Sequence, residues 1–173
     1  KDLTDPLFSL MAQYPDSQFD FLEFRHALEG ICAYYAALRG TESDHKKIKN
    51  LYEEICLNQQ FQDAEAEAKA VSQFYLAVAE ASHNVVLLHL VRSLTPLTEQ
   101  NIRLNLAALQ QRDGIAEKLN DHRRRLMQAV ISRQPELARQ ASNGHLAFIE
   151  EALLELDKER SRIERSLRRS QQS

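Results

Sequence analysis

The scarcity of helix-breaking residues is the feature that most constrains the fold of this chain. Its 173 residues include only four glycines and four prolines, the residue types that most strongly interrupt a helix. Leucine and alanine also outnumber the β-branched residues that favour strands. We therefore predict an all-α fold, a single antiparallel bundle of about six to seven helices. The chain has the length of one domain with one hydrophobic core.

Apolar residues recur at spacings of three and four, which is typical of helices with one buried face. In the first long helix this spacing predicts an inward stripe of Phe21, Phe24, Leu28, Ile31, Tyr35 and Leu38. A later helix, beginning near Val85, carries the stripe Leu90, Leu94, Leu97, Asn101, Leu104 and Ala108. Pro96 lies within that helix and predicts a kink.

The net charge and the cysteines exclude several classes of function. A formal charge of −3 gives no electrostatic basis for this chain alone to hold DNA or RNA. Cys32 and Cys56 lack the close spacing of a metal knuckle, and they fit reduced thiols in the cytoplasm. No apolar run approaches the roughly 18 residues of a membrane span, so we expect no membrane partner.

Two histidines on neighbouring helices form the first candidate site. His122 falls on the apolar stripe of one predicted helix, and His145 falls on the stripe of the next. The turn between the helices centres on Arg133 and Gln134, about midway between the histidines, so an antiparallel hairpin brings both to the same level. The two imidazoles either line one cavity or form a pair of core histidines bonded to neighbouring side chains, and periodicity alone favours the second.

Several motifs resemble one protein family. They are RHALEG at 25–30, AEASHN at 79–84 followed by a leucine-rich helix, HRRRLMQAVI at 122–131, HLAFIEE at 145–151 and ERSLRR at 164–169. Together they make nearly the whole chain similar to the effector-binding (FCD) domain of GntR-type bacterial transcription regulators, and most similar to the subgroup that represses the pyruvate dehydrogenase complex.

This resemblance implies a domain plan and a function. Residues 1–165 would form a helical effector-binding and dimerisation domain, and residues 166–173 a basic C-terminal tail. A winged-helix DNA-binding domain would lie N-terminal to this fragment. The protein would be a cytoplasmic, homodimeric repressor that contacts operator DNA only through that domain. Its effector would be a small carboxylate, pyruvate first, with lactate or another 2-hydroxy acid as the alternative.

The chain departs from the family at the metal site. The resemblance implies metal-ligand roles for His122 and His145, but the family's other two ligands, an Asp and a His, are replaced by Val71 and Tyr75. Valine has no donor atom, and a neutral tyrosine is a poor ligand. A tightly held zinc ion takes at least three protein ligands. We therefore predict a pocket without a metal or other cofactor, with a weak divalent-metal site such as zinc at the two histidines as the alternative.

Without a metal, side chains must neutralise an anionic effector. Arg25 lies beside an apolar stripe, one turn before Glu29, and a guanidinium can grip a carboxylate through two hydrogen bonds; a purely structural Arg25–Glu29 pair is the alternative. Asn101 and Asn105 would supply amide hydrogen bonds in the cavity or a polar contact between helices. Tyr75 would donate its hydroxyl to the ligand or fill the space left by the absent metal.

Two other functions compete with a sensor. Glu23 with His26, and Glu80 with His83, both form the Glu-x-x-His pattern of di-iron enzymes, but the pattern is short and His83 lies at a helix break. The sequence contains no nucleophile elbow, phosphate loop or Cys/His signature, so we predict that the chain is not an enzyme. A dimerisation module without a ligand is the third possibility.

Overall fold

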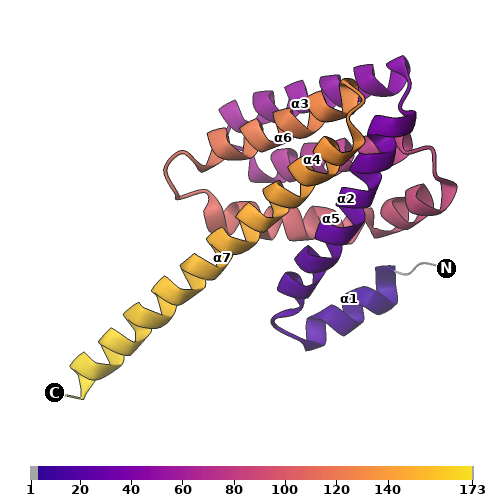
Figure 1. The fold of residues 1–173 in the computed structure, drawn as a ribbon. Coiled ribbons are helices and arrows are strands. Elements are labelled where there is room, and N and C mark those ends of the chain that lie inside the picture. Colours follow the sequence, from indigo (N-terminus) through magenta and orange to yellow (C-terminus); the bar gives the residue numbers. More distant parts are fainter. Residues whose placement is uncertain (1–3, 173) are drawn as a thin grey trace.

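The computed structural model describes residues 4–172, which form seven α-helices and no strand (Figure 1). The prediction of an all-α bundle of six to seven helices is confirmed. The helices are α1 (Thr4–Gln13), α2 (Ser17–Arg39), α3 (Glu42–Gln60), α4 (Ala64–Ala81), α5 (Val85–Leu109), α6 (Ile115–Ile131) and α7 (Pro135–Gln171).

The helix ends follow local sequence signals. Thr41 and Asp44 form a reciprocal capping box at the start of α3, which satisfies backbone donors that a helix leaves free at its N-terminus. The Asn84 side chain accepts hydrogen bonds of 3.0 Å from both Val86 N and Leu87 N at the start of α5. Pro135 occupies the first turn of α7, where its missing N–H costs no helical hydrogen bond.

Helix α4 forms the centre of the bundle. It packs against α2, α3 and α5, while α7 packs along both α2 and α6. Phe74, Val71 and Val78 of α4 are among the most deeply buried side chains. The small α2 residues Ala33 and Ala36 are completely buried, and they leave room for the helices to approach closely.

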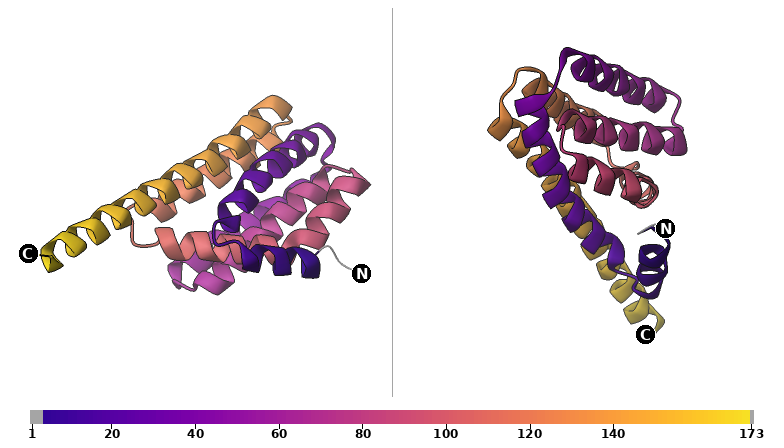
Figure 2. Two further views of the ribbon diagram at one scale, coloured as in Figure 1. Left: turned by 90° about the horizontal axis from the view of Figure 1, so that it is seen from below. Right: turned by 90° about the vertical axis from the view of Figure 1, so that its right-hand side faces the viewer.

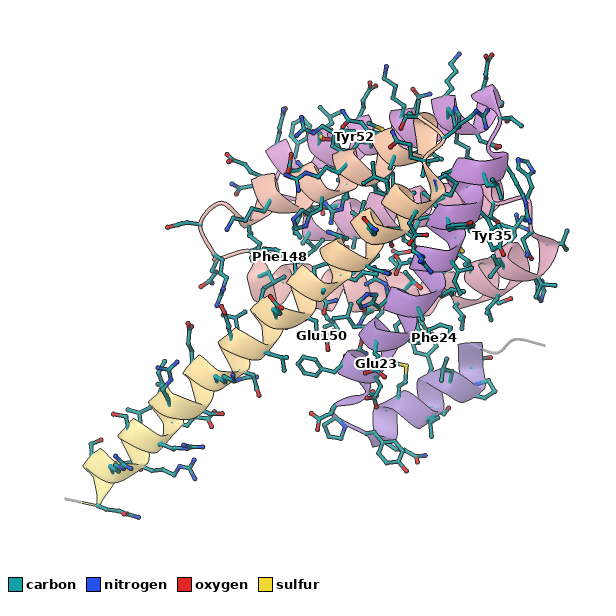
Figure 3. The ribbon with its side chains drawn as sticks, viewed as in Figure 1. Glu23, Phe24, Tyr35, Tyr52, Phe148 and Glu150 are labelled. Atoms are coloured by element: carbon teal, nitrogen blue, oxygen red, sulfur yellow. The ribbon has the colours of Figure 1, made fainter. Side chains whose placement is uncertain are left out.

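The predicted inward stripe of α2 is partly wrong. Phe24, Ile31 and Leu38 are 40%, 44% and 53% exposed, and Figure 3 labels Phe24 on the lower part of α2. Phe21 of the predicted stripe is buried, together with Leu22. The rest of the buried face of α2 consists of the Arg25–Glu29 ion pair and small residues, while three of the large apolar residues of the stripe face outward.

Two segments lie apart from the main core. Helix α1 covers a small second cluster in which Phe21 of α2 and Leu94 and Leu97 of α5 are buried. The last part of α7 projects from the body in every view (Figures 1 and 2), and the helix continues to Gln171. Within residues 4–172, no helix is both long and apolar enough to cross a membrane.

Candidate effector cavity

A small cavity lined by buried residues lies among α2, α4, α5, α6 and α7. About 10 Å³ of it is open to the centre of a water molecule, which is roughly the space that one water needs. Its polar lining is Arg25, Tyr75, Asn105, Arg123 and His145. Its apolar lining is Val71, Ile102, Leu106, Leu109, Leu119 and Ile149.

Arg25 is held by a polar network on one side of the cavity. Its Nε donates to Glu29 Oε2 at 2.9 Å, and its Nη2 donates to Glu29 Oε1 at 3.2 Å. Its Nη1 donates to Asn101 Oδ1 at 2.9 Å. The Asn101 amide in turn donates to the backbone and side-chain oxygens of Gln18. Each of the three guanidinium nitrogens thus has a partner, and the positive charge of Arg25 is matched by the adjacent Glu29 carboxylate.

Burial opposes the charge on Glu29. It raises the pKa of the Glu29 carboxyl above its usual 4.5, while the charge and hydrogen bonds of Arg25 pull this pKa down. The paired hydrogen bonds from the guanidinium to both oxygens need the carboxylate as acceptor. The pair therefore holds each member in its charged form, and it fixes the guanidinium beside the cavity.

Arg123 is the functional candidate that sequence reasoning missed. It is only 2% exposed, yet no carboxylate among residues 4–172 forms an ion pair with it. Its Nη1 donates to Asn120 Oδ1 at 3.4 Å, and its buried Nε has no hydrogen-bond partner in the described chain. A buried cation without a counter-charge is costly, so Arg123 is a strong candidate for binding an anion.

Arg123 was missed because it lies in a run of three arginines, residues 123–125, which resembles an exposed charged segment. Arg124 and Arg125 are exposed and pair with Asp121, as a solvated charged run would. Arg123 alone lies four residues after Leu119 and four before Met127, both of which are buried. That helical spacing was the signal that could have identified it.

Tyr75 and Val71 face the cavity at the two positions where the family would place metal ligands. The Tyr75 hydroxyl is buried and donates to no group within residues 4–172. Burial, with the nearby Glu29 carboxylate, raises the pKa of Tyr75 to about 12, although the Arg123 guanidinium lies close enough to the Tyr75 oxygen to pull this pKa down. The hydroxyl therefore keeps its proton at neutral pH, and its O–H is available to donate to an anion.

The two histidines meet at the level that the hairpin predicts. His122 Nδ1 and His145 Nδ1 are 3.2 Å apart, and their rings stand nearly perpendicular to one another. Burial lowers the pKa of both imidazoles, and for His145 the charges of Arg123, His122 and Arg25 lower it further. The pair is therefore neutral at pH 7, with one ring donating an N–H to the other.

The residues present do not fit a tightly bound zinc ion. Only His122 and His145 offer good donor atoms, because Val71 has none and Tyr75 is a protonated phenol. Arg25 and Arg123 add positive charge beside His145, which opposes a dication. Within residues 4–172, no group of three or more His, Cys, Asp or Glu side chains is placed to hold a metal.

Four of the six predicted site residues line the cavity, namely Arg25, Tyr75, Asn105 and His145. Asn101 is fully buried behind Arg25. It accepts from Asn105 Nδ2 at 3.3 Å as well, so it orients two lining residues. His122 is half-buried behind His145 and packs edge-on against Phe148, a residue that Figure 3 labels on α7. Asn101 and His122 therefore contact residues that line the cavity but do not line it themselves.

The two Glu-x-x-His patterns are not brought together. Glu80 pairs with Lys47 and His83 pairs with Asp44, so both belong to surface contacts between α3 and the end of α4. Glu23 is exposed on α2, where Figure 3 labels it. The geometry therefore does not support a di-iron site built from these four residues.

A larger cleft of about 420 Å³ lies on the other side of the cavity wall. Leu106, Leu109 and Leu119 line both spaces. The mouth of the cleft is rich in amide side chains, including Gln59, Gln62 and Gln110. Gln59 is hydrogen-bonded to Asn120, which also accepts from Arg123. The small cavity and the larger cleft thus share a wall of three leucines.

Comparisons with known proteins identify what this arrangement resembles. A family model described as the FCD domain matches residues 20–148. The putative L-lactate dehydrogenase operon regulatory protein of Escherichia coli K12 is 30% identical over 168 residues, which cover 97% of this chain and 64% of that protein. The Glc operon transcriptional activator of the same strain is 30% identical over 167 residues, with 94% and 65% covered. The chain thus spans somewhat less than two-thirds of these relatives.

The fold is shared with solved structures of lower sequence identity. A structure described as Streptococcus agalactiae GntR has a TM-score of 0.68 and 21% identity, covering 84% of this chain and 63% of that chain. A Listeria monocytogenes structure of the regulator Lar has a TM-score of 0.66 and 18% identity, covering 79% and 63%. At these identities the likeness shows the common helical fold.

Proposed function

The chain belongs to the FCD domain family, the effector-binding domain of GntR-type transcription regulators, and from this premise we propose that it senses a small carboxylate. The carboxylate would bind in the cavity beside Arg25 and Arg123. Binding would favour one arrangement of the domain, and so alter how an attached winged-helix domain holds its operator. A ligand acts in this way only through a difference in its affinity for the two arrangements.

The uncompensated charge of Arg123 carries the proposal. The cavity lining contains two guanidinium groups, whereas Glu29, bonded to Arg25, is the one carboxylate that balances them. The Tyr75 hydroxyl and the Arg123 Nε are both donors without partners in the described chain. A carboxylate placed between them would gain two or more charge-assisted hydrogen bonds and neutralise the buried cation.

Pyruvate is the first candidate effector, and its support is the motif resemblance to the pyruvate dehydrogenase subgroup. Lactate or another 2-hydroxy acid is the alternative, supported by the relative named for an L-lactate dehydrogenase operon. Both have one carboxylate and one oxygen on the neighbouring carbon. The carboxylate would meet Arg123, and the second oxygen would meet an amide or hydroxyl donor such as Asn105 or Tyr75.

The same proposal includes a metal-free mode of binding. Arg123 would supply the positive charge that a zinc ion supplies in a metal-dependent site. Metal binding by His122 and His145 would then be weak or absent. The named relatives are regulators of transcription, which supports a sensor that is not an enzyme. A homodimer in the cytoplasm, acting as a repressor through its DNA-binding domain, completes the proposal.

Calorimetric titration of pyruvate into chelator-treated protein tests this function, with lactate as comparator. We expect saturable heat for the unaltered chain and at least a roughly hundredfold weaker affinity for Arg123→Met, because a bidentate contact to a charged group is lost. The exposed neighbour Arg124→Met is the matched control and should bind normally. Heat that returns only with added zinc would overturn the metal-free mode. No heat with either acid under any condition would favour a dimerisation module without a ligand.

A further inference from the structure

The projecting part of α7 carries an apolar seam that continues from the body of the protein. Leu153, Leu156, Arg160, Ile163 and Leu167, the α7 seam, are spaced alternately by three and four residues. This spacing is typical of helices that pair with another helix along one stripe. Ile163 and Leu167 are 61% and 57% exposed. Figures 1 and 2 show no other described element beside this part of the helix.

The seam begins inside a groove on the body. This groove, about 430 Å³ in volume, is lined by residues of three helices: Gln18 and Phe19 of α2, Leu104, Asn105 and Ala108 of α5, and Leu153, Leu156, Asp157 and Arg160 of α7. Its α7 lining includes the first three members of the seam, together with Asp157. Phe19 and Leu104 are large and more than one-third exposed. The seam thus runs from the groove onto the projecting helix, with Arg160 as its one charged member.

Charge is distributed unevenly along the same helix. Residues 150–159 contain five carboxylates and one lysine, a net charge of −4, whereas residues 160–169 contain five arginines and one glutamate, a net charge of +4. Two such helices side by side in parallel would place like charges together. In antiparallel orientation each basic half lies beside an acidic half, which lowers the electrostatic energy.

We propose that two copies of this chain pair through antiparallel α7 seams, with Leu167 of each copy seated at the groove of the other. Leu156 and Leu167 are eleven residues apart, which is roughly 16 Å along a helix. An antiparallel pair can therefore place Leu167 of one copy beside Leu156 of the other, and the reverse, with Ile163 near Arg160. The interface is two-fold symmetric, so each copy supplies the projecting part of its α7 and receives the partner's α7 at its groove. This pairing rests on the proposed function in one respect, since it identifies the surface of the homodimer included there, and its groove shares Asn105 with the effector cavity.

Sedimentation equilibrium of this chain, with Ile163→Glu and Leu167→Glu combined in one variant, tests the pairing. We expect a dimer for the unaltered chain and association weakened more than roughly tenfold in the variant, because each dimer would bury four carboxylates in an apolar seam. Leu154→Glu is the matched control, since Leu154 is 45% exposed on the same helix but lies off the seam. It should remain dimeric. A monomeric unaltered chain, or a dimer that the seam variant leaves intact, would overturn the proposal.

Disulfide trapping tests the orientation. In a Cys56→Ser background, chains with Leu156→Cys are mixed with separately tagged chains with Leu167→Cys and oxidised. Antiparallel pairing predicts a cross-link in the mixture and none in either sample alone. Self-cross-linking of Leu167→Cys would indicate parallel pairing and contradict the proposed interface. If the chain stays monomeric but retards a DNA duplex in a gel, and loses this binding when Arg168 and Arg169 are replaced, the basic half of α7 binds nucleic acid. That result would also overturn the proposed pairing.

Discussion

At the scale of single residues, the two buried arginines differ in whether a carboxylate balances them. Arg25 and Arg123 are 3% and 2% exposed, and both line the cavity. Arg25 forms two hydrogen bonds with Glu29, whereas Arg123 contacts the neutral Asn120. The stability of the protein without effector should therefore respond in opposite directions when each charge is removed.

Arg123→Met should raise the free energy of unfolding by about 1 kcal/mol or more, because a buried unpaired charge is replaced by an apolar side chain of similar length. Arg25→Met should lower it by about 3 kcal/mol, since Glu29 would be left buried without its partner. Urea unfolding of both variants without effector checks the two signs. A loss of stability in Arg123→Met comparable to that in Arg25→Met would show that Arg123 has an internal counter-charge, and that the cavity does not require an anion.

His145 should make the stability of the protein sensitive to mild acid. Burial, Arg123, His122 and Arg25 hold the pKa of His145 well below 6.5 in the folded state, so the unfolded chain binds the proton more readily. The stabilisation is complete above about pH 6.5 and falls as the pH drops below that value, by up to about 1.4 kcal/mol per pH unit for one group. His145→Gln should flatten the melting temperature between pH 7 and pH 5. An unchanged slope in the variant would contradict a neutral, buried His145.

The sequence identified most of these residues but not their charge balance. The periodicity of α6 and α7 correctly predicts that His122 and His145 meet, because both lie on regular helices joined by a short turn. The contact of Arg25 with Glu29 follows from their spacing of one turn. The isolation of Arg123 depends on what every neighbouring helix presents to it, and such tertiary information is absent from the pattern of one helix.

At the scale of helices, the boundaries follow from local signals, whereas the buried faces depend on tertiary packing. The Thr41 capping box and the Asn84 cap mark where α3 and α5 begin, and both signals are short and local. The buried face of α2 was predicted from its large apolar residues, and Phe21 is buried as predicted, but the Arg25–Glu29 pair takes buried positions that apolar spacing does not indicate. A buried ion pair therefore limits what apolar periodicity can predict.

Two glycines without close neighbours should respond oppositely to the same substitution. Gly114 precedes α6 with a positive φ of 75°, and Gly144 lies within α7; a Cβ at either position would meet nothing within 4 Å. Gly114→Ala should lower the free energy of unfolding by about 1 kcal/mol, because the left-handed conformation strains alanine. Gly144→Ala should raise it by about 0.5–1 kcal/mol through helix propensity. Thermal unfolding measures both changes in stability. Destabilisation by Gly144→Ala would contradict the open space around Gly144, because the added methyl group would then have to clash with a neighbouring group.

At the scale of the whole molecule, the cavity is too small for its proposed ligand. About 10 Å³ accepts the centre of one water molecule, whereas the six non-hydrogen atoms of pyruvate occupy at least two to three times the roughly 30 Å³ share of a water. Binding is therefore expected to enlarge the cavity by shifting side chains or helices among α2, α4, α5, α6 and α7, which line it. Because interiors are closely packed, such a movement repacks neighbouring helices rather than deforming one wall. The required expansion thus links binding to a change in the bundle.

Leu119 should control how fast the effector enters. It lines both the cavity and the cleft, so an effector that enters from the cleft would pass its side chain. Leu119→Ala should increase the association rate of the effector severalfold, and it should cost about 2–5 kcal/mol of stability, as for other buried leucines. Leu126→Ala, on the same helix and 1% exposed, lines neither space and should lose similar stability without faster association. Stopped-flow measurement of the effector association rate in both variants distinguishes a specific effect of Leu119 from a general loss of packing in the bundle. An equal increase in the association rate of both variants would show that the effector enters through general opening of the bundle. Entry would then not depend on the three leucines between the cavity and the cleft.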